Sequence, residues 1–181
     1  PFEYDSTLIE SIESVEKVVS TPDPDLPGQK PFESKGGVRH VQSYIYLPGI
    51  ITHDDQMEGI VLKGVGDDYD WKVINQYNES DTAWTTLGDD ELIISRITAD
   101  RLRLKQDDKL ILHFVREGKQ LQRRFSIKGI YKTGLEENDA KFAIASIQRV
   151  RDVLKWDSTK VSGLEISIDN IDDLDLITEY I

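Results

Sequence analysis

The alternation of apolar and polar residues between positions 121 and 131 constrains the fold more than any other feature of the chain. The apolar positions are Leu121, Phe125, Ile127 and Tyr131, and the polar positions between them are Gln122, Arg124, Ser126 and Lys128. A period of two is typical of a strand with one buried face. The segment "REGK" separates this run from the apolar run 109–115, which predicts a β-hairpin. The chain must therefore form a sheet that packs its apolar side on a core.

The rest of the chain mixes strand and helix patterns. Runs rich in β-branched and aromatic residues predict strands at 38–51, 57–65, 141–146 and 164–169. Helical spacing of apolar residues predicts helices at 8–20, 94–104, 146–156 and 171–181, with Ser95 and Ser146 as N-caps. These patterns predict an α+β fold with mixed or antiparallel sheets and packed helices, arranged in two lobes.

Two stretches interrupt the regular patterns. Residues 21–31 hold four prolines and one glycine, which predicts a stiff surface linker. Residues 66–90 are rich in acids, amides and aromatic rings, which favours an irregular connection anchored by a few of those rings. We place the internal boundary there and predict one lobe from residues 1–87 with 161–181, and an inserted small α/β lobe from residues 88–160.

The charge balance limits the partners. Thirty-four acidic residues against 22 basic ones give a formal net charge of −12, so nucleic acid and anionic membrane surfaces are repelled. The absence of cysteine excludes disulfides, thiolate metal sites and cysteine nucleophiles. No apolar run approaches the ~18 residues of a membrane helix. The chain starts without Met and stops inside a helical pattern, so we expect an excised domain whose flanking segments have been removed.

Residues suited to chemistry are sparse. Five could in principle contribute to a metal site: His53, Asp54, Asp67, Asp68 and Asp70. Aspartates also suit turns for backbone reasons, and the spacing of an EF-hand is missing, so a solvated turn is the simpler interpretation. His113 lies inside an expected strand as a cross-strand neighbour. No nucleotide-binding or nucleophile motif is present, and we predict no catalytic, cofactor or metal residues.

A small basic island lies on the expected hairpin. Its members are Arg116, Lys119, Arg123 and Arg124. In the simpler interpretation, these charges protect an exposed hairpin tip from pairing with another chain. In the more specific one, they form a docking site for an acidic partner. The three tryptophans, Trp71, Trp84 and Trp156, also have two interpretations. Either they anchor loops on the core, which is the simpler one, or they form part of a contact surface.

Three stretches, taken in order, resemble the MacB-like periplasmic core domain of FtsX-like ABC transporter permeases, and especially the LolC/LolE lipoprotein-release type. Residues 37–71 look like that family's "GV..V" strand, turn and "G..L.G" strand. Residues 92–114 look like its "I.LG..LA..L.V..GD.I.L" segment. Residues 123–154 look like its "F.V.GIF.TG..E.D" segment and the helix after it. The likeness runs from about residue 38 to residue 168 and contains folding signals only.

The resemblance implies a role without catalysis. It implies the periplasmic domain of an inner-membrane ABC transporter permease that is held by flanking membrane helices. Its partners would be a second permease subunit, a separate cytoplasmic ATPase and a lipoprotein or peptide cargo. The lobe 1–87 with 161–181 would then be the membrane-proximal one. Open alternatives are a soluble acidic metal-dependent binding protein or enzyme, and an adaptor that binds partners through the Arg123-Arg124 hairpin.

The chain departs from the family's pattern at three places. Arg103 and Asp107 stand where the family usually has glycines, so we expect the end of that helix to differ. The hairpin turn in "VREGKQLQ" is too short for the loop with which LolC-type subunits engage a periplasmic chaperone, which favours a LolE-type or related exporter. Gly134, Glu136 and Asp139 match a family loop as turn residues.

Overall fold

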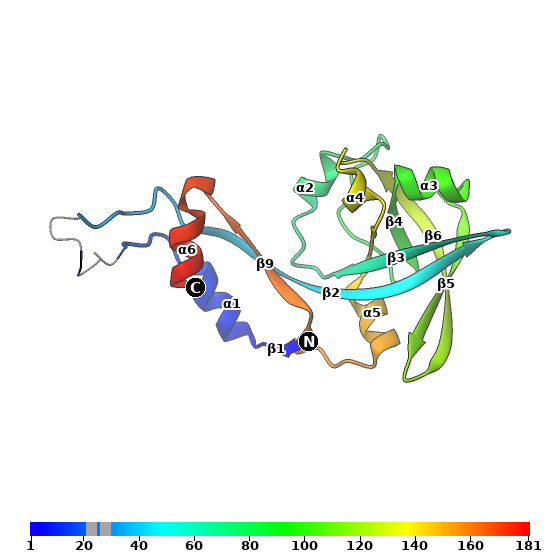
Figure 1. Cartoon of the computed structure of the whole chain (residues 1–181), viewed down its shortest axis with the longest axis horizontal. Coiled ribbons are helices and arrows are strands. Elements are labelled where there is room, and N and C mark those ends of the chain that lie inside the picture. The colour runs from blue at the N-terminus through cyan, green and yellow to red at the C-terminus, as the bar shows by residue number, and fades with distance from the viewer. Residues whose placement is uncertain (21–24, 26–29) are drawn as a thin grey trace. The chain divides into compact units, whose positions relative to one another are not determined.

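The computed structural model describes residues 1–20, 25 and 30–181. Its backbone forms two compact units. Residues 1–2 and 43–163 make up the barrel unit, and residues 3–42 and 164–181 make up the terminal unit. The predicted α+β class is confirmed by the mixture of helices and strands (Figure 1). Most of the proline-rich linker predicted at 21–31 lies outside the described residues.

The elements follow the chain in this order. The strands are β1 (Phe2–Glu3), β2 (Val38–His53), β3 (Gln56–Val65), β4 (Glu91–Ser95), β5 (Lys109–Arg116), β6 (Lys119–Tyr131), β7 (Phe142–Ser146), β8 (Lys160–Val161) and β9 (Gly163–Ile168). The helices are α1 (Ser6–Glu13), α2 (Trp71–Asn75), α3 (Arg96–Leu102), α4 (Glu136–Asp139), α5 (Ile147–Leu154), the 3₁₀ turn η1 (Ile171–Asp173) and α6 (Leu174–Tyr180).

Six of the described strands close into a barrel (Figure 1). They are hydrogen-bonded in the order β3-β7-β4-β6-β5-β2, and β2 pairs again with β3 to complete the ring. The β3–β7 and β4–β6 pairs are parallel, and the other pairs are antiparallel. Fully buried residues on the inward positions of the strands form the core, among them Ile45, Leu62, Leu92, Leu112 and Phe125. The predicted hairpin β5–β6 is therefore part of a closed wall.

The barrel is built from two halves with the same order of elements. The order β2-β3-α2-β4-α3 is followed by β5-β6-α4-β7-α5. The strands β4 and β7 pair antiparallel with Ile93 opposite Ile144, and each ends in a serine that precedes its helix. Each helix ends at a left-handed residue, Arg103 or Lys155. We infer an internal two-fold repeat that the sequence analysis did not recognise.

The segment after β3 covers one side of the barrel wall. Trp84 and Ile74 pack with Ile93 and Ile144 in a second apolar cluster on the outward side of β4 and β7. The side chain of Asn75 holds this segment, because it accepts from the backbone N–H of Trp84 at 2.8 Å and donates to its carbonyl at 2.7 Å. Residues 66–87 thus fold with the barrel, not apart from it.

The compact units differ from the lobe boundaries expected from the sequence. The units change at 42/43 and 163/164, whereas the expected boundaries were 87/88 and 160/161. The reason is that residues 43–65 supply two strands of the barrel and residues 66–87 cover its wall. Residues 43–163 of the barrel unit stand in the sequence between the two segments of the terminal unit, and residues 1–2 precede both. Which unit lies nearer a membrane stays a prediction.

Several local expectations need correction. The helix expected at 8–20 ends at Glu13, because the backbone beyond it bonds elsewhere: Val38 donates to the carbonyl of Val15, and Ser34 donates to that of Val18. The strand β4 was not predicted: residues 91–93 were assigned to no element, and residues 94–95 to the start of the following helix. The helix after it starts as predicted, with Ser95 accepting from the N–H of Thr98 at 3.1 Å.

The two positions at which the sequence resemblance expects glycine have a left-handed backbone. Arg103 has φ 54° and Asp107 has φ 69°. A non-glycine residue carries a cost of about 1 kcal/mol there, and Arg103 ends α3 in spite of it, with its N–H bonded back to Asp100. The end of α3 is therefore left-handed, although arginine stands there in place of the glycine that the resemblance expects.

The terminal unit combines α1, η1 and α6 with residues 38–42 of β2 and 164–168 of β9. Its core contains Ile12, Val41 and Ile177. The fully buried carboxylate of Asp173 accepts from the backbone N–H groups of Lys35 at 2.8 Å and Gly36 at 3.1 Å, which fixes the turn before β2.

Among the described residues, every helix is too short or too polar to cross a bilayer.

Candidate partner-binding site

The β5–β6 hairpin distributes the basic island over two faces. Arg116 is opposite Lys119, Leu112 is opposite Arg123, and Ile111 is opposite Arg124. Because side chains alternate along a strand, Arg116, Lys119 and Arg123 share the face of buried Leu112, and Arg124 lies on the other face. The four residues therefore do not form a single flat patch, although all four belong to the same hairpin.

Arg116 has a structural contact. Its Nη1 donates to the backbone carbonyl of Val153 at 2.6 Å, near the end of α5. The other half of the barrel repeats this arrangement, since Nδ1 of His53 lies 3.1 Å from the carbonyl of Leu102, the last residue of α3. Both residues end the first strand of their hairpin, and each satisfies a carbonyl that a helix C-terminus leaves open.

The other three basic residues face solvent. Lys119 and Arg124 are exposed, and Arg123 is half-buried with its Nη1 bonded to the neighbouring carbonyl of Gln122 at 2.8 Å. In the parts of the chain that the structure describes, none of the three forms an ion pair. Val115, next to them, is 76% exposed. The hairpin thus offers positive charge and some apolar surface on an otherwise acidic chain.

The residues of the metal hypothesis have separate roles. Asp54 is exposed in the turn after β2 with φ 51°, and its carboxylate is 4.0 Å from His53, which contacts α3. Asp68 accepts from the N–H of Ser43 at 2.8 Å, and Asp70 caps α2. Within residues 1–20, 25 and 30–181, no three His, Asp or Glu side chains are grouped as a metal site.

The remaining singled-out residues act within the fold. Nε2 of His113 is 2.9 Å from Oγ1 of Thr52 on the neighbouring strand, as expected for a cross-strand neighbour. Trp84 is buried in the second apolar cluster, and Trp71 packs against that cluster and against the ring of Tyr69. The interpretation of these two tryptophans as loop anchors is confirmed.

The loop "TGLEEND" is organised by a buried carboxylate. Asp139, 1% exposed, accepts from the N–H groups of Thr133 at 3.1 Å and Gly134 at 3.2 Å, and from Oγ1 of Thr133 at 2.6 Å. Gly134 has φ 83°, which favours glycine. Gly134 and Asp139 are thus turn residues, as expected, and Glu136 is exposed at the start of α4.

Tyr131, beside this loop, gives a pH-dependent prediction. Burial raises the pKa of Tyr131 above its ordinary value of 10.0, and the negative charge of Asp139 raises it further. The folded protein therefore keeps this proton where the unfolded chain releases it, so stability is lost as the pH rises above 10. We expect the advantage of wild type over Tyr131→Phe in urea unfolding to shrink between about pH 8 and pH 11. An unchanged difference would contradict the burial of the hydroxyl, which donates to the carbonyl of Phe142 at 2.9 Å.

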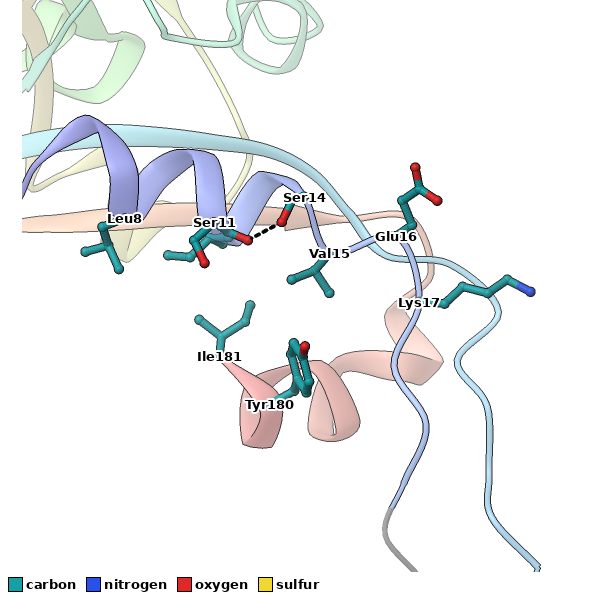
Figure 2. A pocket seen from close by; sticks show the side chains of 9 residues that line it. Leu8, Ser11, Ser14, Val15, Glu16, Lys17, Tyr180 and Ile181 are labelled. Atoms are coloured by element: carbon teal, nitrogen blue, oxygen red, sulfur yellow. Dashed lines mark hydrogen bonds between the residues drawn. The ribbon is translucent and has the colours of Figure 1, made fainter.

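Sequence reasoning missed a hollow in the terminal unit. Figure 2 shows Leu8, Ser11 and Val15 on one side of it and Tyr180 and Ile181 on the other. Its volume is about 480 Å³. The two sides come from opposite ends of the chain, so no local pattern predicts the hollow, although both helices carry apolar residues at helical spacing.

Comparison with known proteins shows a similarity of fold to a solved structure. No protein-family model matches the chain, and no curated protein matches it. Among solved structures, it is similar to the extracellular domain of the noncanonic ABC-type transporter YknZ from Gram-positive bacteria. The TM-score is 0.57 at 13% sequence identity, over 97% of this chain and 78% of that domain. At this identity the similarity establishes a shared fold.

Proposed function

We propose that the chain is the extracytoplasmic domain of an ABC transporter permease. The observation that carries the proposal is the shared fold with a transporter's extracellular domain across 97% of the chain. The ordered resemblance of residues 38–168 to the periplasmic domains of FtsX-like permeases supports the same function independently.

In this role the domain transmits movement and presents surfaces, and the bond-making chemistry occurs in a separate ATPase. The side chains that were candidates for catalysis or metal binding have structural contacts instead, which supports a domain without chemistry of its own. Asp68, Asp70 and Asp139 each hold backbone N–H groups of the fold, and His53 contacts a helix end. We therefore propose a protein without enzymatic activity of its own.

The finer proposal is a permease of the lipoprotein-release type in the inner membrane, with this domain in the periplasm. Its partners would be a second permease subunit, a cytoplasmic ATPase and a lipoprotein or peptide cargo. Flanking membrane helices would hold the domain. Support for this level comes from the sequence resemblance, which is greatest for the LolC/LolE type, and from the short hairpin turn, which favours the LolE-type or a related exporter.

Topology of the full-length protein in its host tests the proposal. The chain has no cysteine, so a single cysteine at exposed Asp81 gives a defined label site. A membrane-impermeant maleimide should label it in cells whose cytoplasmic membrane is intact, and the ATPase should co-purify with the protein. Labelling only after lysis would refute an extracytoplasmic domain. Depletion should in addition leave lipoproteins in the inner membrane; normal lipoprotein sorting would refute only the finer proposal.

The basic hairpin is proposed as a docking site for an acidic segment of a partner, because its exposed cations lack acidic partners in the described structure. We expect Lys119→Glu with Arg123→Glu and Arg124→Glu to lower retention of the partner about tenfold or more in pull-downs. The melting temperature should change by less than about 2 °C, since none of the three contributes an ion pair. Arg116 stays unchanged in this variant because it contacts α5.

A matched control has the same change in net charge elsewhere. Lys72, Lys132 and Lys141 are exposed, and their reversal to glutamate should leave retention unchanged. Equal loss of retention in both variants would mean that overall charge, not the hairpin, governs the interaction. Unchanged retention in the hairpin variant would refute docking there.

A further inference from the structure

The outward face of β2 and β3, which run side by side in the barrel (Figure 1), is apolar. Side chains alternate along a strand, so the residues between the buried ones point away from the core. Tyr46, Ile50 and Met57 are 38%, 43% and 68% exposed on this face. Apolar residues that are exposed together, not singly, mark contact sites. We call this surface the apolar wall, and its members are Tyr44, Tyr46, Pro48, Ile50, Met57, Val61 and Phe142.

The register of the strands makes the apolar wall continuous. Pro48 on β2 is opposite Val61 on β3, and Val61 is opposite Phe142 on β7. The ring of Tyr46 packs against that of Phe142, with centroids 5.4 Å apart, and against that of Tyr44, with centroids 4.6 Å apart. The wall therefore extends over three neighbouring strands.

The fold does not require apolar residues there, because the second half of the barrel carries polar ones. His53 and Arg116 end the equivalent strands β2 and β5. Ile50 precedes the first of these ends by as many residues as His113 precedes the second. Since the repeated strands tolerate polar side chains at these positions, the apolar wall has a cause other than folding. Four pairs of equivalent positions differ in this way: Ile50 and His113, Tyr46 and Lys109, Met57 and Gln120, Val61 and Arg124.

The charge on this outward face is positive, although the chain as a whole is acidic. Lys63 stands at the next outward position of β3 after the wall. Arg124 on β6 is in the same row of paired residues as Met57, with Thr52 and Ile111 between them. None of the outward positions of the four strands is Asp or Glu. These positions are every second residue of 44–52, 57–63, 109–115 and 120–126.

We infer that the apolar wall binds a segment of another protein whose apolar side chains are flanked by aspartate or glutamate. Aromatic residues, methionine and arginine are enriched in the centres of protein interfaces, and Asp and Glu are depleted there, as on this face. Lys63 and Arg124 attract carboxylates, whereas a symmetric pair of these chains would bring the same cations together. Anionic lipid is disfavoured by the net charge of −12.

The inference does not depend on the proposed transport function. The face that carries the wall shares only Arg124 with the basic hairpin, because Lys119 and Arg123 lie on the opposite face of that hairpin. Labelling of the domain only in lysed cells would refute the proposed function and leave binding at the wall unaffected.

Selection of peptides on the 181-residue chain tests the inference without a known partner. The probe is a library of random peptides of about 16 residues displayed on phage. We expect the enriched peptides to combine aliphatic or aromatic residues with Asp and Glu. One of them, labelled with fluorescein, is then measured by fluorescence anisotropy. The wall variant, Ile50→Ser with Met57→Ser, should weaken its binding about tenfold or more, as loss of exposed anchors does.

Two matched controls separate the wall from general attraction. Arg124 and Arg123 are neighbours on opposite faces of β6. Arg124→Glu should weaken binding about tenfold, an effect that fades at high salt, and Arg123→Glu by less than about twofold. Val73 and Leu135 are apolar residues outside the wall, 49% and 61% exposed. Their replacement with serine should leave binding unchanged.

Several outcomes would overturn the inference. They are enrichment of basic peptides or of none, full binding by the wall variant, and an equal loss in Arg123→Glu and Arg124→Glu. A dimer of this chain that the wall variant dissociates would assign the wall to a second copy instead. Binding to phosphatidylglycerol vesicles that the wall variant abolishes would assign it to lipid.

Discussion

Replacing Gly129 with alanine is expected to destabilise the barrel unit by about 3 kcal/mol. A Cβ at this position of β6 would lie only 2.3 Å from Cζ2 and 2.6 Å from Cε2 and Nε1 of Trp84. The indole cannot easily move away from the methyl group, because Trp84 is only 4% exposed. Its backbone N–H and carbonyl are both hydrogen-bonded to the side chain of Asn75. The indole must leave the second apolar cluster or the strand must move.

A double-mutant cycle identifies the cause. Trp84→Ala alone should cost about 3–5 kcal/mol, as for other buried tryptophans. In that background Gly129→Ala should cost less than about 0.5 kcal/mol, because nothing remains for the methyl group to meet. Strictly additive losses would contradict direct contact between Trp84 and Gly129. Urea unfolding followed by tryptophan fluorescence suits the measurement, because all three tryptophans lie in the barrel unit.

Gly59 provides the matched control. It is exposed on β3, and a Cβ built there meets no atom within 4 Å. Alanine should therefore change stability by less than about 0.5 kcal/mol and could add some by restricting the unfolded chain. A large loss at Gly59 would show that strand glycines are needed for backbone reasons alone.

Local patterns in the sequence predicted most elements because their causes are local. The alternation of residues 121–131, the turn "REGK" and the N-cap Ser95 each act within a few residues, and β6, its hairpin and the start of α3 followed. The end of α1 and the closure of the barrel have causes far away in the chain. The N–H of Val38 that bonds to Val15, and the pairing of β4 with β7, could not be inferred from either partner alone.

The candidate sites likewise have some features with local causes, which the sequence predicts, and others with distant causes, which it does not. Charge on the hairpin was visible in the sequence, but the bond from Arg116 to α5 was not, since Val153 is 37 positions away. The hollow between α1 and α6 joins residues near position 8 with residues at position 180, so only the structure reveals it. The terminal unit carries a net charge of −10 and the barrel unit one of −2, and this difference could have been counted in advance had the boundaries at 42/43 and 163/164 been known.

Replacement of Asp139 with alanine is expected to cost the barrel unit about 3 kcal/mol. The change leaves the N–H groups of Thr133 and Gly134 and the hydroxyl of Thr133 without their acceptor in a buried site, at about 1–3 kcal/mol for each unsatisfied group that water cannot reach. Exposed Glu137→Ala in the same loop should change stability by less than about 0.5 kcal/mol. Urea unfolding monitored by tryptophan fluorescence measures both.

Asparagine at position 139 distinguishes a turn residue from a ligand for a cation. Its amide oxygen can accept from the two N–H groups, and its NH₂ can donate to Oγ1 of Thr133, so the loss should be only about 1 kcal/mol. A role in binding a cation requires the charge, and asparagine would then be as damaging as alanine. Removing the charge also takes away one cause of the raised pKa of Tyr131. Burial, the larger cause, remains, so the loss of stability between about pH 8 and pH 11 should be the same in Asp139→Asn as in wild type.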